Sequence, residues 1–557
     1  MDGITEKNMI YCQKPKESEK NMIQCDTGKT MNIHMEEILY YAFIIVLMGA
    51  KGIGLTDGQR LFTLCLLSAS VLWGLKICLT RHSIREWLLI LALLFLGGII
   101  YRRTGEKAAI AAVAVIVGMK NVPLERLMKV CLAVWGGTFL FSVVRGLLGF
   151  YDGVVVVHEK LGLGPIIRYS LGYTHPNVLH VTYFILVMLV IYVCRPSGKK
   201  LYWSAFLLFV GNLYVFLYSI SYTGILIVTA YLMLVIYFDI RKKLIWPEKI
   251  AALLLFAFCV AFPIAGPFVL KGEAFNFFNR LLSTRFELVY NNFSQNKLTL
   301  FGTYIPPNPE ANLSLDSSFA YMLMYYGIVA FIMCVGLYFF SIYYCMSHNR
   351  LQETAILLGT AIAGITEQFL YNLSFKNITF FIMGYVLYAG LLKSRKTSWL
   401  YRERTLLPIK KNDVIQIRRT GIFEKAWRAA AEIWKEKKIR IICTGVLFAL
   451  ALTIAWRIFG EIPDYVLVGR MTTDYRGEDE LVMGPEVTAP GDLYITFGDV
   501  SEGSGVYKFA GNTIKMELYR GMASTIVWGF LDGCIVAFLV TGTGRMIAEK
   551  RRKDERA

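Results

Sequence analysis

The sequence predicts an all-α polytopic membrane protein with about 14 transmembrane helices, and three observations lead to that fold class. Hydrophobic residues make up 55% of the 557 positions, and charged residues make up only 18%. The mean hydropathy is +0.49, which is above the range of an ordinary soluble domain. Apolar runs of about the length that crosses a bilayer recur along most of the chain.

These apolar runs give the predicted membrane spans in chain order. The run at 107–119 is short for a crossing, because a helix needs about 20 residues to span the hydrocarbon core. A large polar loop, residues 271–317, separates the ninth span from the tenth, and a connection of that length is usually either disordered or functional. The spans lie at residues 38–55, 61–79, 86–101, 107–119, 127–150, 177–194, 201–218, 222–238, 250–270, 318–346, 354–372, 375–393, 441–459 and 523–541.

Four regions follow from this pattern. Residues 1–35 form a polar tail that we expect to be loosely ordered. They show no cleavable signal peptide, so the first apolar run is predicted to be a retained anchor. The polytopic body occupies residues 36–393, and a basic cytoplasmic connector follows at residues 394–440. Residues 441–557 then form a two-span hairpin around an outer insert, residues 460–521.

The connector and the insert have patterns of their own. Phe423, Trp427 and Trp434 recur at helical spacing, with Lys and Arg on the opposite face. They predict an amphipathic helix, which lies either in the inner headgroup region or on the protein's own inner surface. In the insert, Pro and Gly punctuate short alternating runs such as residues 493–497. The insert is therefore predicted to be small and β-rich.

The formal net charge of +18 is placed in a way that argues against a nucleic-acid partner. Basic residues gather in short segments between spans, as the positive-inside rule expects of cytoplasmic loops. They place both termini in the cytoplasm and the large loop outside, in the cytoplasmic membrane with lipids as surroundings. The residues are Lys120, Arg126, Lys129, Arg195, Lys199, Lys200, Arg241, Lys242 and Lys243, with the tail at 550–553.

The sequence predicts no cofactor and no metal site. The 11 cysteines are scattered, many of them inside spans, with neither a disulfide framework nor metal-ligand spacing. There is no nucleotide-binding phosphate loop and no His-Glu-x-x-His motif. No span carries Arg at the regular spacing of a voltage sensor. These absences argue against a built-in ATP motor, a zinc protease of that type and a voltage-gated channel.

Arginine on the outer side runs against the usual charge distribution of membrane proteins, so each outer Arg needs a reason. Arg102, Arg168, Arg280 and Arg285 are predicted to lie there. A guanidinium keeps its charge and can grip a phosphate with two parallel hydrogen bonds, so several of them converging on one cavity would suit a diphosphate. The alternative is that they snorkel to headgroups or pair with nearby carboxylates.

Four other polar residues are candidates at the same face. His175 and Asn177 flank Pro176 at the mouth of the sixth span, where the imidazole either takes a proton from a hydroxyl or begins the helix. Asp316 is either a site residue or the N-cap of the tenth span. Glu367 lies near the outer end of the eleventh span, where a carboxylate usually faces a cavity or a partner. An outer Arg would be that partner, and both an ion-pair role and substrate contact are open.

Several short segments, in order, resemble the O-antigen polymerase and ligase superfamily, and most closely the Wzy-type repeat-unit polymerases of Gram-positive bacteria. The resemblance covers about residues 38–393 and leaves the C-terminal hairpin outside it. The segments are 118–122 (GMKNV), 168–177 (RYSLGYTHPN), 218–224 (YSISYTG), 301–303 (FGT), 315–318 (LDSS) and 325–328 (YYGI), with Arg280 and Arg285 between the third and the fourth.

The resemblance implies a glycosyl transfer on the outer face of the membrane. The donor would be an oligosaccharide repeat unit linked to undecaprenyl diphosphate, and neither a nucleotide sugar nor a metal would be needed. Arg168, Arg280 and Arg285 would hold the diphosphate and stabilise the charge of the leaving group. A chain-length regulator and a flippase would be partners.

The resemblance also implies roles for other positions. His175 would orient or deprotonate the acceptor hydroxyl, and Asp316 is the second candidate. Tyr222 stands where many relatives carry Arg, so that part of the phosphate grip is lost or supplied elsewhere, for instance by Arg102. The predicted substrate-binding residues are therefore Arg102, Arg168, Asn177, Tyr222, Arg280, Arg285 and Glu367.

Two other functions compete with a polymerase. A ligase of the same superfamily would move finished glycan to another acceptor, and the motifs separate the two poorly. A lipid-linked oligosaccharide flippase can also have about fourteen spans, but it should carry charged residues along a central cavity in two pseudo-symmetric halves. In this sequence the unusual residues gather at one membrane face, which favours catalysis there over transport.

Overall fold

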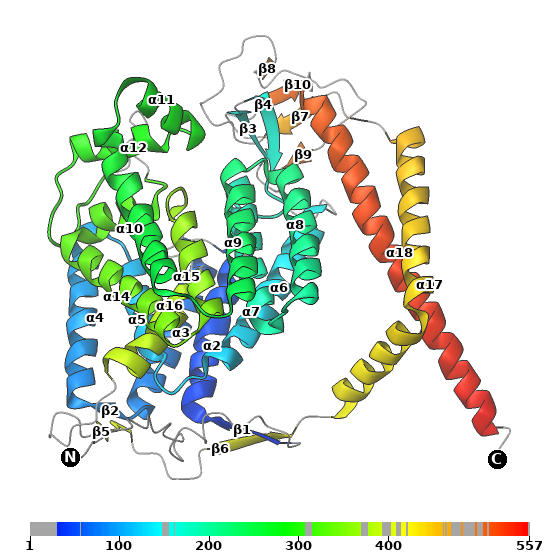
Figure 1. The fold of residues 1–557 in the computed structure, drawn as a ribbon, viewed down its shortest axis with the longest axis horizontal. Coiled ribbons are helices and arrows are strands. Elements are labelled where there is room, and N and C mark those ends of the chain that lie inside the picture. The colour runs from blue at the N-terminus through cyan, green and yellow to red at the C-terminus, as the bar shows by residue number, and fades with distance from the viewer. Residues whose placement is uncertain are drawn as a thin grey trace, which may run out of the picture.

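The chain folds into a helical body with a long helical hairpin beside it (Figure 1). The computed structural model describes residues 30–55, 57–147, 155–160, 162–306, 315–368, 377–392, 403–407, 414–418, 421–460, 462, 465–468, 481–482, 496–497, 505–508 and 512–554. The body consists of α2 (Met35–Gly52), α3 (Arg60–Leu79), α4 (Ile84–Thr104), α5 (Ala108–Gly118), α6 (Leu124–Leu147), α7 (Pro176–Cys194), α8 (Lys199–Ser219), α9 (Tyr222–Arg241), α10 (Trp246–Val269), α13 (Ser318–Tyr321), η1 (Met322–Tyr326), α14 (Gly327–Ser347), α15 (Leu351–Ala363), α16 (Thr379–Val386) and η3 (Leu387–Leu391).

Different elements mark the two ends of the body (Figure 1). At the end that is uppermost in the figure, β3 and β4 form an antiparallel hairpin beside the short helices α11 and α12. At the lower end, β1 pairs with β6 and β2 pairs with β5. The bounds are β3 (Val155–Lys160), β4 (Gly164–Tyr169), α11 (Gly272–Leu281), α12 (Arg285–Gln295), β1 (Thr30–His34), β6 (Val414–Arg418), β2 (His82–Ser83) and β5 (Glu403–Arg404).

The C-terminal hairpin consists of α17 (Gly421–Phe459) and α18 (Asn512–Asp554), which pack along each other. Four short strands between them form one sheet in the order β8-β10-β7-β9. Their bounds are β7 (Tyr465–Val468), β8 (Leu481–Val482), β9 (Thr496–Phe497) and β10 (Gly505–Lys508). The hairpin reaches the body through α18, which contacts α8 and β4 near the upper end.

Ten helices of the described chain are long and apolar enough to cross a membrane. Three shorter apolar helices lie among them, over Ala108–Gly118, Leu351–Ala363 and Thr379–Leu391. Leu64 on α3 and Leu88 on α4 are exposed, and a helix that satisfies its own backbone can present such side chains to lipid. The chain is therefore an all-α polytopic membrane protein. The full number of crossings stays a prediction.

The large polar loop, 271–317, differs from the irregular connection that the sequence suggests. It contains α11 and α12, and the aromatic side chains of α11 pack on the end of α10. The ring centroids of Phe262 and Phe278 lie 5.3 Å apart, and Phe286 of α12 joins the same cluster. The sequence predicts only a large polar loop here, and the structure adds two short helices of 10 and 11 residues within it.

Three further boundaries are corrected by the structure. The end of the polar tail is β1, because residues 30–34 pair with the connector strand β6, whereas residues 1–29 lie outside the described chain. The amphipathic helix predicted near Trp434 and the span at 441–459 are one continuous helix, α17, since no Pro interrupts them. For the same reason α18 begins at Asn512, inside the predicted insert.

The eleventh and twelfth spans are shorter than predicted. α15 ends at Ala363 and α16 begins only at Thr379. The turn that follows α15 exposes backbone carbonyls, and side chains from other elements satisfy them. Ser317 donates its hydroxyl to the Gly364 carbonyl at 3.3 Å, and Ser318 donates to the Glu367 carbonyl. Irregular backbone of this kind is tolerated at membrane depth only where protein groups or a cavity satisfy it.

Candidate functional site

Three basic side chains are buried together at the upper end of the body. Lys160 ends β3, Arg168 lies on β4 and Arg285 begins α12, and they are 8%, 3% and 6% exposed. The charges of all three act on one another, since Arg168 and Arg285 both repel the Lys160 ammonium. A buried charge is costly unless it is paired or serves a ligand, so the partners of each need to be identified.

Arg168 is anchored by two neighbouring segments. Its Nε donates to the Ser219 carbonyl at 2.6 Å, at the end of α8, and its Nη2 donates to Asn177 Oδ1 at 2.5 Å, in the first turn of α7. Within the described residues, Nη1 has no partner, so its N–H groups can serve a ligand. Burial lowers the pKa of Arg168 to about 10 against the opposing effect of Glu367, and the guanidinium stays charged at neutral pH.

Arg285 is anchored by the chain turn after α15. Its Nε donates to the Thr366 carbonyl at 2.5 Å and its Nη1 to the Leu282 carbonyl at 2.9 Å. Its Nη2 lies 3.5 Å from Glu367 Oε1 and 3.6 Å from Asp316 Oδ2. The two carbonyl bonds fix the plane of the guanidinium, so Nη2 points at the two carboxylates.

The two carboxylates differ in how they are held. Glu367 Oε1 accepts the Thr223 hydroxyl at 3.0 Å, and the Glu367 side chain is only 12% exposed. The Asp316 side chain is 37% exposed and pairs with Arg285 alone among the described residues. The N-cap of α13 is Ser317, so the interpretation of Asp316 as the helix cap was wrong. Asp316 is the more accessible acid of the site.

Lys160 is the basic residue without a fixed partner. Its Nζ lies 5.9 Å from the centre of the Tyr222 ring, and no hydrogen bond or ion pair holds it within the described part of the chain. Burial, with Arg168 and Arg285, lowers the pKa of Lys160 to about 7, and Glu367 opposes that shift. Three cations thus face two carboxylates, which leaves a net positive site.

His175 begins α7, as the helix-entrance interpretation expects. Its Nδ1 accepts the backbone N–H of Asn177 at 3.1 Å. In the neutral ring the proton therefore lies on Nε2, which donates rather than accepts. Asn177 in turn receives Arg168, so His175 is tied to the site through Asn177. In this state the imidazole orients a neighbour and does not act as a base.

The structure brings together only part of the predicted arginine set. Arg102 is exposed in the last turn of α4, and Arg280 is exposed in the last turn of α11. Neither side chain has a hydrogen bond or an ion pair to the cluster. The four predicted arginines therefore divide into a buried pair, Arg168 and Arg285, and an exposed pair, Arg102 and Arg280.

Two members of the cluster were missed from the sequence. Lys160 lies in a stretch without helical pattern, and the glycines at 162 and 164 with Pro165 were the turn signals that could have placed it in a hairpin beside Arg168. Thr223 lies within the segment 218–224, but nothing in the sequence tells that its hydroxyl reaches Glu367.

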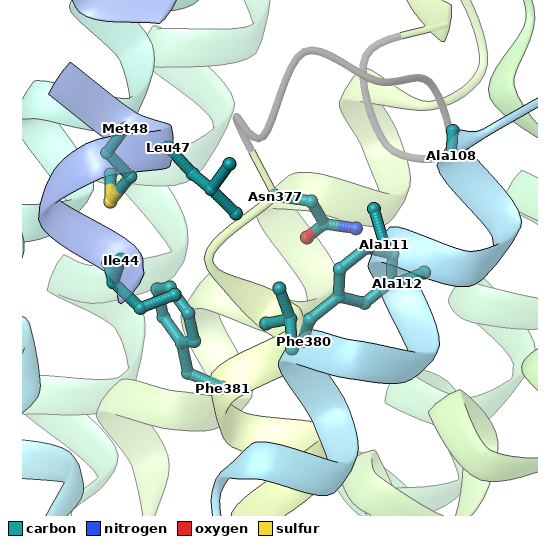
Figure 2. Close-up of a pocket in the computed structure, with 10 residues that line it drawn as sticks. Ile44, Leu47, Met48, Ala108, Ala111, Ala112, Asn377, Phe380 and Phe381 are labelled. Carbon is teal, nitrogen blue, oxygen red and sulfur yellow. The ribbon is translucent and has the colours of Figure 1, made fainter. Parts of the chain in front are cut away.

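A small pocket lies elsewhere, between α2, α5 and α16 (Figure 2). Its lining is apolar except for Asn377, which points in among Phe380, Ala108 and Ala111. The cavity volume is about 20 Å³, enough for about one water molecule. It is therefore a packing defect of the body and not a substrate site.

The cluster combines fixed guanidinium donors, one ammonium and one accessible carboxylate, which suits an anionic ligand with an adjacent hydroxyl. Within the described residues, no group of three or more His, Cys, Asp or Glu side chains is placed to hold a metal ion. No family model, no curated protein and no solved structure matches the chain. The function is therefore argued from the geometry of the site.

Proposed function

We propose that the chain is a membrane-embedded glycosyltransferase that polymerises oligosaccharide repeat units linked to undecaprenyl diphosphate. The observation that carries this proposal is the burial of Lys160, Arg168 and Arg285 around one net positive site. A diphosphate carries negative charge that would offset the cost of burying three cations, and guanidinium groups bind it with paired hydrogen bonds. The sugar next to that diphosphate would then lie beside the carboxylates.

The reaction breaks the bond between the anomeric carbon of the donor sugar and its phosphate oxygen. A new glycosidic bond forms between that carbon and a hydroxyl oxygen of the acceptor unit. Undecaprenyl diphosphate leaves with the bonding electron pair, and Lys160, Arg168 and Arg285 stabilise its growing charge, which is an electrostatic contribution to catalysis. The hydroxyl proton passes to a base.

Asp316 is the base that the geometry favours. It is the more exposed carboxylate and lies beside the guanidinium that would hold the donor. Glu367 is held by Thr223 and Arg285, so its role is to position Arg285. His175 uses Nδ1 to accept a backbone N–H, and we assign it an orienting role at the acceptor rather than proton removal.

We further propose fourteen crossings, with both termini in the cytoplasm and the upper end outside. Ten long helices, α2 and the three short apolar helices add up to that number. The basic loops near Arg126, Lys200 and Lys242 all lie at the lower end, as the positive-inside rule expects of the cytoplasmic side. The polymer would then grow on the outer face.

A ligase that uses the same lipid-linked donor would share the diphosphate grip. A flippase fits less well, because Lys160, Arg168 and Arg285 are buried together at one end of the body and not along its middle. Deleting the gene separates polymerase from ligase. Loss of all long polymer supports the polymerase, whereas long polymer that accumulates on the lipid carrier contradicts it and favours the ligase.

The direct test uses purified protein and the lipid-linked repeat unit extracted from the deletion strain. Wild-type protein should convert the unit into a ladder of lengths on a gel. Arg285→Ala should lower the rate by at least about a hundredfold, because it removes a fixed cation that would stabilise the charge of the leaving group. Arg280→Ala is the matched control, since this exposed arginine lies close by in the chain, and its rate should stay within about twofold. Equal rates for the two variants would contradict the site.

A further inference from the structure

One acidic side chain lies in the middle of a membrane-crossing helix and faces outward. Asp532 lies on α18, midway along the predicted span 523–541, and it is exposed. Among the described residues, no donor lies within hydrogen-bonding or ion-pairing distance of its carboxylate. A carboxylate at the bilayer centre is costly, so a residue of this kind usually contacts a group that offsets its charge.

The face of α18 that carries Asp532 continues the face that docks on the body. Arg520 donates to the Leu217 carbonyl at 2.6 Å, and the hydroxyls of Ser524 and Tyr218 are hydrogen-bonded. Two turns below Arg520, the Trp528 indole donates to Tyr214 Oη at 3.1 Å. Asp532 follows Trp528 by one further turn, so it lies on nearly the same side of the helix.

Among the described residues, the bond from Trp528 is the last hydrogen bond that joins α18 to α8. In Figure 1, α18 descends away from α8 and from the rest of the body. Exposed apolar side chains continue on both helices past the last contact. On α18 they are Leu531, Ile535 and Leu539, with 42%, 55% and 60% exposure, and on α8 they are Trp203, Leu207 and Val210, with 68%, 66% and 41%.

We propose that this face of α18 binds a transmembrane helix of a different protein, through a Lys or Arg on that helix. Apolar side chains above and below the carboxylate suit a helix that crosses the same bilayer. The carboxylate itself selects a cationic side chain, because an ion pair removes the cost of an unpaired charge in lipid. The contact stands on the membrane span alone and is independent of the reaction proposed above.

A second copy of this chain does not offer the complementary charge. In the described spans, Lys and Arg residues lie near helix ends or are buried, as Lys76 is on α3. Arg457 lies near the upper end of α17, and Arg440 precedes the apolar part of the same helix. A copy docked through Asp532 would therefore meet lipid or another carboxylate and no cation.

The test uses purified full-length protein in phosphatidylcholine vesicles and a synthetic Leu-rich transmembrane peptide with one central lysine. Energy transfer from labelled protein to labelled peptide gives the affinity, and a peptide with leucine in place of the lysine is the reference. Wild-type protein should bind the lysine peptide about tenfold more tightly than the reference. Asp532→Asn and Asp532→Leu should each lose that difference.

Glu432→Gln is the matched control, because Glu432 is an exposed carboxylate on the same hairpin outside the apolar span. This variant should keep the tenfold preference. Equal affinity of wild-type protein for both peptides, or a preference that survives Asp532→Asn, overturns the proposal. The proposal is also overturned if two differently labelled copies of the protein show energy transfer and Asp532→Asn abolishes it. That result would assign this face of α18 to a second copy. Asp532→Asn changes the shape very little and decides the question if the leucine variant does not fold.

Discussion

Lys160 is the residue that distinguishes a ligand-binding site from a network of ion pairs that only supports the fold. Arg168 and Arg285 are each held by two fixed acceptors, whereas the Lys160 ammonium faces the same space and makes no hydrogen bond or ion pair to any residue that the structure describes. In a purely structural network of ion pairs, a buried charge is expected to have a partner, because burying it unpaired is costly. Under the proposed function, the donor diphosphate would supply the missing anion.

The lowered pKa of Lys160 gives a pH dependence with a definite sign. Burial and the two arginines bring this pKa to about 7. The Lys160 side chain is therefore charged below about pH 7 and loses its proton and its charge above it. An anion binds the charged form better. The affinity for the sugar-linked lipid diphosphate should therefore fall by about tenfold between about pH 6 and pH 9. The diphosphate in that donor is esterified at both ends, so its own charge does not change over this range.

Binding of the donor to the protein in nanodiscs measures this effect. Lys160→Arg should hold its affinity across the whole range, because a guanidinium keeps its charge. Lys160→Met should bind weakly at every pH, with a flat profile. A wild-type slope that persists in the methionine variant would assign the titration to another group.

At the scale of elements, the close contact of α7 with α9 positions the acidic side of the site. A Cβ on Gly224 would lie 2.3 Å from the ring of His180, which is buried and bonded to Ser219 and Asn212. Thr223, which holds Glu367, is the residue just before Gly224 on α9. The glycine therefore lets the two helices approach closely enough to bring Thr223 to the carboxylate.

Gly224→Ala should destabilise the protein by about 1–3 kcal/mol, since the buried imidazole cannot move without losing its bonds. Gly74→Ala on α3 is the control, because nothing lies within 4 Å of the added carbon. That variant should be neutral or up to about 1 kcal/mol more stable, as alanine favours a helix over glycine. Reversible unfolding in mixed detergent and SDS micelles measures both. A stable Gly224→Ala protein would show that the helices can part without cost.

A second element-scale contact ties the C-terminal hairpin to the site. Arg520 of α18 is 2% exposed and donates to the carbonyls of Ile167 and Leu217, at 2.7 and 2.6 Å. Ile167 precedes Arg168, and Leu217 lies in the last turn of α8, just before the Ser219 carbonyl that anchors Arg168. The hairpin thus braces both backbone segments that hold one guanidinium.

Arg520→Ala should lower donor affinity and polymerisation by about tenfold, because it leaves two buried carbonyls unpaired and loosens β4. Arg545 lies at the far end of the same helix and forms an exposed ion pair with Glu432. Arg545→Ala should therefore stay within about twofold. The same assays as for Arg285 measure both variants. If Arg520→Ala keeps full donor affinity, the hairpin does not support the site.

The comparison of sequence and structure shows which features local sequence patterns can predict. Long apolar runs place the helices, because the bilayer demands about 20 apolar residues from each crossing. Arg168 and Arg285 were candidates because arginine is uncommon on the predicted outer side of a membrane protein. The pairing of Glu367 with one of these arginines was predicted, and Arg285 makes that contact. The bond from Arg285 to the Thr366 carbonyl could not be predicted, since it joins segments far apart in the sequence.

Contacts between distant segments also explain the missed elements. The β3–β4 hairpin is held by its own pairing and by α8 and α18, whose positions depend on the whole fold. α11 and α12 are too short for a clear period, and the aromatic residues of α10 complete their core. Sequence patterns therefore predict the fold class and part of the site, and tertiary packing decides which polar residues meet.

At the scale of the whole molecule, the elements divide between two ends that must face different compartments. The cluster of Lys160, Arg168 and Arg285, with α11, α12 and the β3–β4 hairpin, lies at one end, and the strands joining the tail to the connector lie at the other (Figure 1). A polymer that grows outside the cell requires the first end to be extracytoplasmic. The side that each end faces is therefore a condition of the proposed function.

Cysteine labelling in intact cells tests that condition. In a background whose 11 native cysteines are replaced, Tyr304→Cys in the large loop and Lys515→Cys at the start of α18 should react with a membrane-impermeant maleimide. Lys243→Cys, between α9 and α10, should react only after the cells are permeabilised. All three positions are exposed in the fold, so the reaction reports the side of the membrane and not burial. The reverse pattern at Tyr304 and Lys243 would place the cations in the cytoplasm and contradict the polymerase. Disagreement between Tyr304 and Lys515 would instead show that the number of crossings between them is odd, and the fourteen-crossing topology would be wrong.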